Sequence, residues 1–93
     1  MVLSPEALEK RVSEGINKHF RCMTGKIDRY LQEDMLEGNR APFQYVLEDD
    51  EVPEAIRARV FRKIVKAYSD NGWNARCEAY IPGSHLFTFK KKQ

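Results

Sequence analysis

A row of apolar residues spaced three or four positions apart over the first third of the chain is the feature that most constrains its fold. Its members are Leu8, Val12, Ile16, Phe20, Met23, Ile27, Leu31 and Met35. This spacing places them on one face of an α-helix, so the sequence predicts a long amphipathic helix. Ser4 and Pro5 suit its start, and Gly38 suits its end. Gly25 weakens a helix interior, so residues 5–37 could form either one helix or two in series.

Three shorter segments have the alternation of a β-strand, and a second amphipathic helix lies between the first and second of them. The segments are residues 43–47, 75–81 and 86–90. Pro82-Gly83 between the last two favours a hairpin turn. The second helix is predicted to begin at Pro53 and to run to about Ser69, because Ile56, Val60 and Ile64 form a helical apolar row there.

The order helix, strand, helix, strand, strand predicts an α+β fold in a single domain, residues 1–93, with a helical arm (1–38) and a β-α-β-β unit (42–93). A strand-helix-strand unit prefers parallel strands. With the hairpin, this predicts a three-stranded mixed sheet with the second helix on one face. The long helix exceeds the length of so narrow a sheet, so its stripe predicts a homodimer or partner interface. The interface residues would be Leu8, Val12, Ile16, Phe20, Ile27 and Leu31.

The composition is that of a folded, soluble protein, with 42% hydrophobic and 32% charged residues. No apolar run approaches the roughly 20 residues that span a bilayer, so no membrane partner is expected. The first residues do not have the pattern of a signal peptide, which favours the cytoplasm. The only cysteines, Cys22 and Cys77, are expected to be free thiols.

Charge is distributed unevenly along the chain. Residues 1–56 contain 7 Lys/Arg against 12 Asp/Glu, a net −5, whereas residues 57–93 contain 9 against 2, a net +7. The basic half would attract nucleic acid or an acidic partner. The candidate contacts are Arg59, Arg62, Lys63, Lys66, Arg76, Lys90, Lys91 and Lys92. A solvated helix face and a solubilising tail explain the same residues equally simply.

The sequence predicts neither a cofactor nor a metal site. Glu48-Asp49-Asp50-Glu51 is an acidic stretch, but it does not have the spaced oxygen ligands and central glycine of a calcium loop. Its acids favour the start of the following helix instead. His19 has no second ligand at a helical spacing, so a partly buried structural histidine is expected there.

Residues 64–89 resemble the HicA family of toxin ribonucleases. They contain the end of a helix, the pair Gly72-Trp73, a strand, and then Gly83-Ser84-His85 at the next turn. The resemblance implies that His85 is catalytic, since a histidine near neutral pKa can take a proton from a ribose 2′-hydroxyl. Glycine and serine also suit a turn for backbone reasons, and a turn residue exposed at the hairpin is our expectation for His85.

The layout of the whole chain is similar to that of small accessory proteins of bacteriophage genomes. It has an N-terminal amphipathic helix, then a strand, a helix, Gly72-Trp73 and a terminal hairpin. The resemblance implies a non-enzymatic regulatory or inhibitory protein, encoded by a phage, that binds a host or viral macromolecule in the cytoplasm of the bacterial host. A protein partner is the leading hypothesis. The alternatives are RNA or DNA binding by the basic helix face, and a HicA-like ribonuclease that uses His85.

Overall fold

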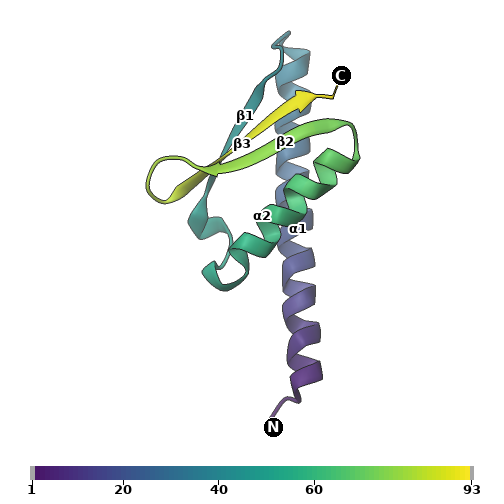
Figure 1. The fold of residues 1–93 in the computed structure, drawn as a ribbon, viewed down its shortest axis with the longest axis vertical. Helices are drawn as coiled ribbons and strands as arrows, with labels where there is room; N and C mark the ends of the chain where they lie inside the picture. Colours follow the sequence, from purple (N-terminus) through teal and green to yellow (C-terminus); the bar gives the residue numbers. More distant parts are fainter. Residues whose placement is uncertain (1, 93) are drawn as a thin grey trace.

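The computed structural model describes residues 2–92, and its elements occur in the predicted order (Figure 1). They are helix α1 (Pro5–Leu36), strand β1 (Phe43–Glu48), the short 3₁₀ turn η1 (Asp49–Glu51), helix α2 (Glu54–Asp70), strand β2 (Trp73–Ala79) and strand β3 (Ser84–Lys91). The α+β class and the order of helices and strands are confirmed.

Helix α1 is one continuous helix rather than two in series. The Ser4 hydroxyl accepts a hydrogen bond from the Ala7 N–H at 3.2 Å, and Pro5 occupies the first turn, as the sequence indicated. The helix continues through Gly25 without a break. It ends before Gly38, whose φ of 85° is a left-handed conformation that glycine adopts at little cost.

The three strands form a sheet in the order β1-β3-β2, and β3 is antiparallel to both of its neighbours. The sheet is therefore antiparallel throughout rather than mixed, which corrects the expected pairing. Strands β1 and β2 still run in the same direction, as a strand-helix-strand unit favours, but β3 lies between them. The central position suits β3 because its Phe87 and Phe89 are fully buried. An edge position would leave these rings partly uncovered.

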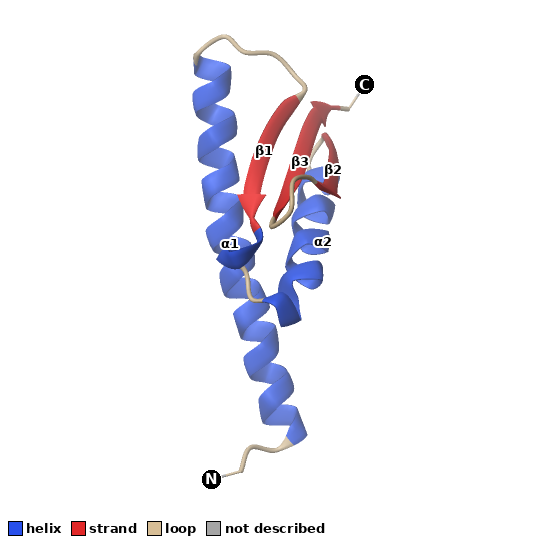
Figure 2. Cartoon of the chain, turned by 90° about the vertical axis from the view of Figure 1, so that its left-hand side faces the viewer, coloured by secondary structure: helices blue, strands red, loops and turns tan. Residues whose placement is uncertain are grey.

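Both helices cover the same face of the sheet. Tyr68 of α2 packs its ring against Phe89, and Tyr30 of α1 packs against Tyr45 of β1. The largest fully buried side chains are Phe87, Phe89, Ile27, Leu47, Ile64, Val52 and Val60. The opposite face of the sheet carries no helix, so the fold has two layers with one side of the sheet uncovered (Figure 2).

The N-terminal part of α1 extends beyond the rest of the molecule (Figures 1 and 2). The radius of gyration is 15.0 Å, against about 12 Å for a compact domain of this length. Met23, Ile27 and Leu31 are buried in the core, whereas Leu8 and Val12 are exposed. Ile27 and Leu31 are thus packed within their own chain, which corrects the prediction that they belong to an interface.

Candidate functional site

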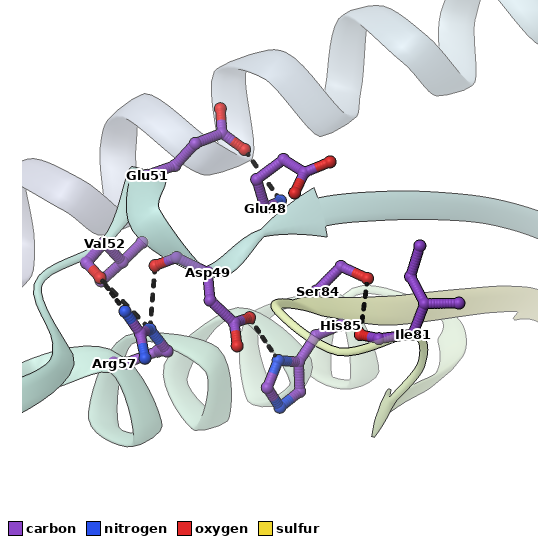
Figure 3. Close-up of polar contacts among 8 residues, drawn as sticks. All are labelled: Glu48, Asp49, Glu51, Val52, Arg57, Ile81, Ser84 and His85. Atoms are coloured by element: carbon purple, nitrogen blue, oxygen red, sulfur yellow. Dashed lines mark hydrogen bonds and ion pairs between the residues drawn. The ribbon is translucent and has the colours of Figure 1, made fainter.

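A short side-chain contact joins His85 of β3 to Asp49 of the η1 turn (Figure 3). The His85 Nδ1 atom lies 2.6 Å from the Asp49 Oδ1 atom, and both side chains are mostly buried. His85 is near the start of β3, and Asp49 begins the η1 turn after β1. This corrects the expectation of a freely exposed hairpin residue.

The backbone around Asp49 is held in place from two sides. The Asp49 N–H donates to the Gly83 carbonyl at 2.9 Å, which ties the turn to the hairpin. The Arg57 guanidinium donates to the Asp49 carbonyl at 2.9 Å and also to the Val52 carbonyl (Figure 3). The carboxylate of Asp49 therefore contacts His85 from a turn whose backbone is fixed by these hydrogen bonds. A carboxylate in this position favours the tautomer with hydrogen on Nδ1, which leaves Nε2 as the proton acceptor.

His85 also lines a hollow between α2 and the end of β2. Its ring meets the ring of Phe61 edge to face, with centroids 4.8 Å apart, and Arg62 and Cys77 line the same hollow. Burial, with smaller contributions from the carboxylates of Asp49 and Glu78, raises the pKa of the Cys77 thiol to about 11. The thiol is therefore protonated at neutral pH and is a poor nucleophile. The hollow combines an oriented imidazole with a nearby cation.

The sequence contained both partners of this pair but no local signal that joins them. Residues 49 and 85 are 36 positions apart, and only the pairing of β1 with β3 brings them together. Among the neighbouring acids, Glu51 also has partners. Glu51 accepts a hydrogen bond from the Glu48 N–H and forms an ion pair with Lys26 at 3.0 Å. Within residues 2–92, no group of three His, Cys, Asp or Glu side chains is arranged to hold a metal ion.

The predicted basic residues do not form one surface. Arg59, Arg62, Lys63 and Lys66 belong to α2, on the helical side of the sheet. Arg76 and Lys90 line a hollow on the opposite, uncovered face, which corrects the expectation that they lie near the basic helix. In the lysine tail, the Lys92 ammonium is already engaged, because it donates to the Ser69 carbonyl at the end of α2.

Two of the α2 cations are also engaged within the chain. The Lys63 ammonium donates to the side chain of Asn17 and lies 4.9 Å from the centre of the half-buried Phe20 ring. Lys66 forms an ion pair with Asp70 at 2.8 Å, which raises the pKa of the lysine and lowers the pKa of the aspartate. A phosphate ligand would have to compete with these contacts.

The uncovered sheet face carries apolar side chains at its hairpin end. Val46 of β1 lies directly opposite Leu86 of β3, and Tyr80 follows the end of β2 on the same face. Val46, Tyr80 and the neighbouring Ile81 are 44%, 57% and 58% exposed. We call Val46, Tyr80, Ile81 and Leu86 the hairpin patch. The alternation of the strands indicated the face of Val46, Tyr80 and Leu86, but it grouped Ile81 with Ala75 on the opposite face, and Ile81 lies in the turn after β2. It also did not indicate that this face of the sheet is left uncovered.

A second exposed apolar surface lies on the projecting part of α1. Leu8, Val12 and Ile16 line a hollow beside Arg59 of α2, and Leu8 and Val12 are 49% and 41% exposed. Of the predicted interface residues, Leu8 and Val12 are exposed, whereas Ile16 and Phe20 are half-buried against the core, and Phe20 lies beneath Lys63. His19 on the same helix is half-buried, in the state that the sequence suggested.

In the part of the chain that the structure describes, neither helix combines the length and apolar character needed to cross a membrane. Comparisons of the chain with protein-family models, with curated proteins and with solved structures find no match.

Proposed function

We propose that this chain is a small non-enzymatic regulatory or inhibitory protein that binds another protein through the uncovered face of its sheet. The observation that carries the proposal is the hairpin patch. Three of its four side chains are more than two-fifths exposed, and Val46 and Leu86 lie opposite each other on the face without a covering helix. Exposed apolar clusters with a polar rim are typical of protein interaction sites.

The surroundings of the patch favour a protein as its partner. Arg76, Glu78 and Lys90 lie on the same face, so the apolar centre has charges of both signs beside it. Interfaces between proteins commonly combine such a rim with an apolar centre that contains aromatic residues, and Tyr80 is the exposed aromatic residue here. Two cations on this face would also suit an acidic partner.

Affinity capture with a matched control tests this proposal. Tagged protein is incubated with nuclease-treated bacterial lysate, and any captured protein is then purified and titrated against the wild type directly. Val46→Glu with Tyr80→Glu should weaken that direct binding by at least about tenfold, because it places charges in the apolar centre. The control, Ala55→Glu with Ala58→Glu, adds the same charges at exposed positions of α2 and should bind normally.

Equal binding by the two variants would contradict the role of the hairpin patch. A partner that disappears on nuclease treatment would instead support nucleic-acid binding by the basic face of α2. In that case Arg59→Glu with Lys66→Glu should reduce the salt dependence of binding by roughly one unit of slope for each phosphate that is no longer neutralised.

The contact between His85 and Asp49 favours a second candidate function, a metal-independent ribonuclease. A carboxylate on Nδ1 leaves Nε2 free to take a proton from a ribose 2′-hydroxyl, whose oxygen would attack the phosphorus while the 5′-oxygen leaves and is protonated by water. Arg62 in the same hollow could stabilise the charge on the phosphate. The resemblance of residues 64–89 to HicA ribonucleases implies the same role for His85.

Cleavage of a fluorescent RNA by purified protein tests this candidate. His85→Ala should reduce the rate by a factor on the order of a hundred or more. Asp49→Asn should also reduce it, because the amide no longer favours the correct tautomer. Lys18→Ala, an exposed change on α1, serves as the control. Wild-type protein with no activity above buffer, or a fully active His85→Ala variant, would rule the ribonuclease out.

A further inference from the structure

We infer that the projecting half of α1 docks against the same segment of a second copy, with the two helices antiparallel and the two-fold axis near Val12. This surface is separate from the hairpin patch. The segment comprises residues 5–19, which we call the arm. Three features of the molecule support the inference: the apolar hollow on the arm, Gly15, and the charges of Glu9 and Arg59.

The hollow on the arm has the form of a helix-binding groove. Leu8, Val12 and Ile16 are spaced at successive turns along one side of α1, and Arg59 of α2 borders them. In an antiparallel pair centred on Val12, Leu8 of one copy lies opposite Ile16 of the other, and Val12 meets its own equivalent. Each apolar side chain of the arm thereby gains an apolar neighbour.

Gly15 adds room for a close approach. It lies next to the apolar row, on the side away from Arg59, and a Cβ atom placed there would meet no other atom within 4 Å. A glycine inside a helix costs about 0.5–1 kcal/mol relative to alanine, and no contact within the chain accounts for that cost. In the antiparallel pair, Leu8 of the second copy lies beside this glycine, where the missing side chain leaves space for it.

Charge selects the antiparallel orientation. Arg59 and Glu9 border the same hollow, and neither forms an ion pair with a described residue. In a parallel pair, the two-fold axis would place Arg59 and Glu9 of the two copies on opposite sides of the contact, so no charge pair would form across it. The antiparallel pair places Arg59 of each copy beside Glu9 of the other, so the contact contains two complementary charge pairs.

The shape of the molecule permits this arrangement. The arm extends beyond α2 and the sheet (Figures 1 and 2), so two antiparallel arms place the remaining parts of the two copies at opposite ends. The molecule measures 55 Å along its longest axis but 29 Å and 20 Å across. No element of the second copy then has to enter the space that the first occupies.

Cysteine cross-linking tests the orientation of the two helices. In a Cys22→Ser, Cys77→Ser background, a mixture of Leu8→Cys and Ile16→Cys proteins should form a disulfide-linked dimer under mild oxidation. Val12→Cys should form one alone, whereas Leu8→Cys alone should remain mostly monomeric. Efficient cross-linking of Leu8→Cys to itself and not to Ile16→Cys would show a parallel pair and overturn the inference.

Sedimentation equilibrium between about 1 and 200 µM tests whether the dimer forms and which charges select it. Wild-type protein should self-associate. Glu9→Arg and Arg59→Glu should each weaken association at least about threefold, and the double exchange should restore most of the loss. Leu8→Glu with Val12→Glu should be monomeric and folded by circular dichroism, because both positions are exposed. If this double variant unfolds, Val12→Lys provides a second test, because it is also expected to be folded and monomeric.

A wild-type protein that stays monomeric throughout this range would overturn the inference, as would a double exchange without any recovery. Neither result would affect the proposed function, which is tested by the hairpin-patch variants. Conversely, a dimer that persists in Val46→Glu with Tyr80→Glu would support the inference even where no other protein is captured.

Discussion

The two halves of α1 have the same apolar spacing but different surroundings. In the C-terminal half, Met23, Ile27 and Leu31 pack against α2 and the sheet and form part of the core. In the N-terminal half, Leu8 and Val12 continue the same stripe but are 49% and 41% exposed, bordered only at one side by Arg59 of α2 among the described residues. One periodic pattern therefore produces a core contact in one half and an exposed apolar surface in the other.

The contrast shows how much of the packing helical periodicity can predict. An apolar stripe indicates which face of a helix should be buried, but it does not indicate which element will bury it. Here α2 and the three-stranded sheet are shorter than α1, so their cover ends near Ile16. The remaining apolar area is bordered by Arg59 of α2 but stays partly exposed, and only another molecule could remove the rest of it from water.

The largest predicted effect comes from a matched pair of truncations in the two halves. Ile27→Ala should lower the free energy of unfolding by about 2–5 kcal/mol, because Ile27 is fully buried and its loss leaves a cavity. Val12→Ala should cost less than about 0.5 kcal/mol in dilute protein. Urea denaturation of both variants measures this difference. Equal losses would show that the arm is packed within the monomer and that the two halves do not differ.

An intermediate effect is expected at the contact that fixes the C-terminal half. The Tyr68 hydroxyl donates to Asp28 at 2.5 Å and also contacts the Thr24 carbonyl at 3.2 Å. Tyr68→Phe should therefore lower the free energy of unfolding by about 1–3 kcal/mol. The corresponding removal of the Ser4 cap in the projecting half, Ser4→Ala, should cost about 1 kcal/mol or less.

The same tyrosine predicts a dependence on pH. Burial, followed by the hydrogen bond to Asp28, raises the pKa of Tyr68 above its ordinary value of 10.0. The folded state thus keeps its proton after the unfolded state has lost it, so this contribution is complete below pH 10 and is lost as pH rises further. Wild type should lose stability between pH 9.5 and about 11 faster than Tyr68→Phe. Parallel curves for the two proteins would contradict the assignment.

The smallest effect concerns the two glycines inside α1, one in each half. A Cβ atom at Gly15 or at Gly25 would meet no other atom within 4 Å. Replacement of either by alanine should raise the free energy of unfolding by about 0.5–1 kcal/mol in dilute protein. In concentrated protein, Gly15→Leu should weaken the proposed dimer, whereas Gly25→Leu should leave it unchanged. Sedimentation of the two leucine variants provides the comparison.

Local patterns were sufficient for the elements of the fold. Ser4 and Pro5 mark the start of α1, Asn71-Gly72 follows the end of α2, and Pro82-Gly83 forms the hairpin turn. Each of these signals acts through the conformational preferences of one to four neighbouring residues. The order of the strands in the sheet could not be predicted in the same way. The preference of β1 and β2 for a parallel direction does not indicate whether a third strand lies between them.

The candidate sites were predicted only in part. Arg59, Arg62, Lys63 and Lys66 share α2 as expected, but Arg76 and Lys90 lie across the sheet from them. The reason is the strand alternation itself. Position 76 faces away from the core because Ala75 faces toward it. The hypothesis of one basic surface treated nearness in sequence as nearness in space.

Residue spacing and local backbone preferences were sufficient to predict the helical segments, the hairpin and the apolar face of each element, but they left open whether residues 5–37 form one helix or two. The tertiary structure shows one continuous helix there. It also shows that β3 is central, that one sheet face and the end of the arm are left uncovered, and that Asp49 meets His85. Those outcomes depend on contacts between segments tens of residues apart. No local pattern encodes such contacts, since they form only when all the elements compete for the same buried surface.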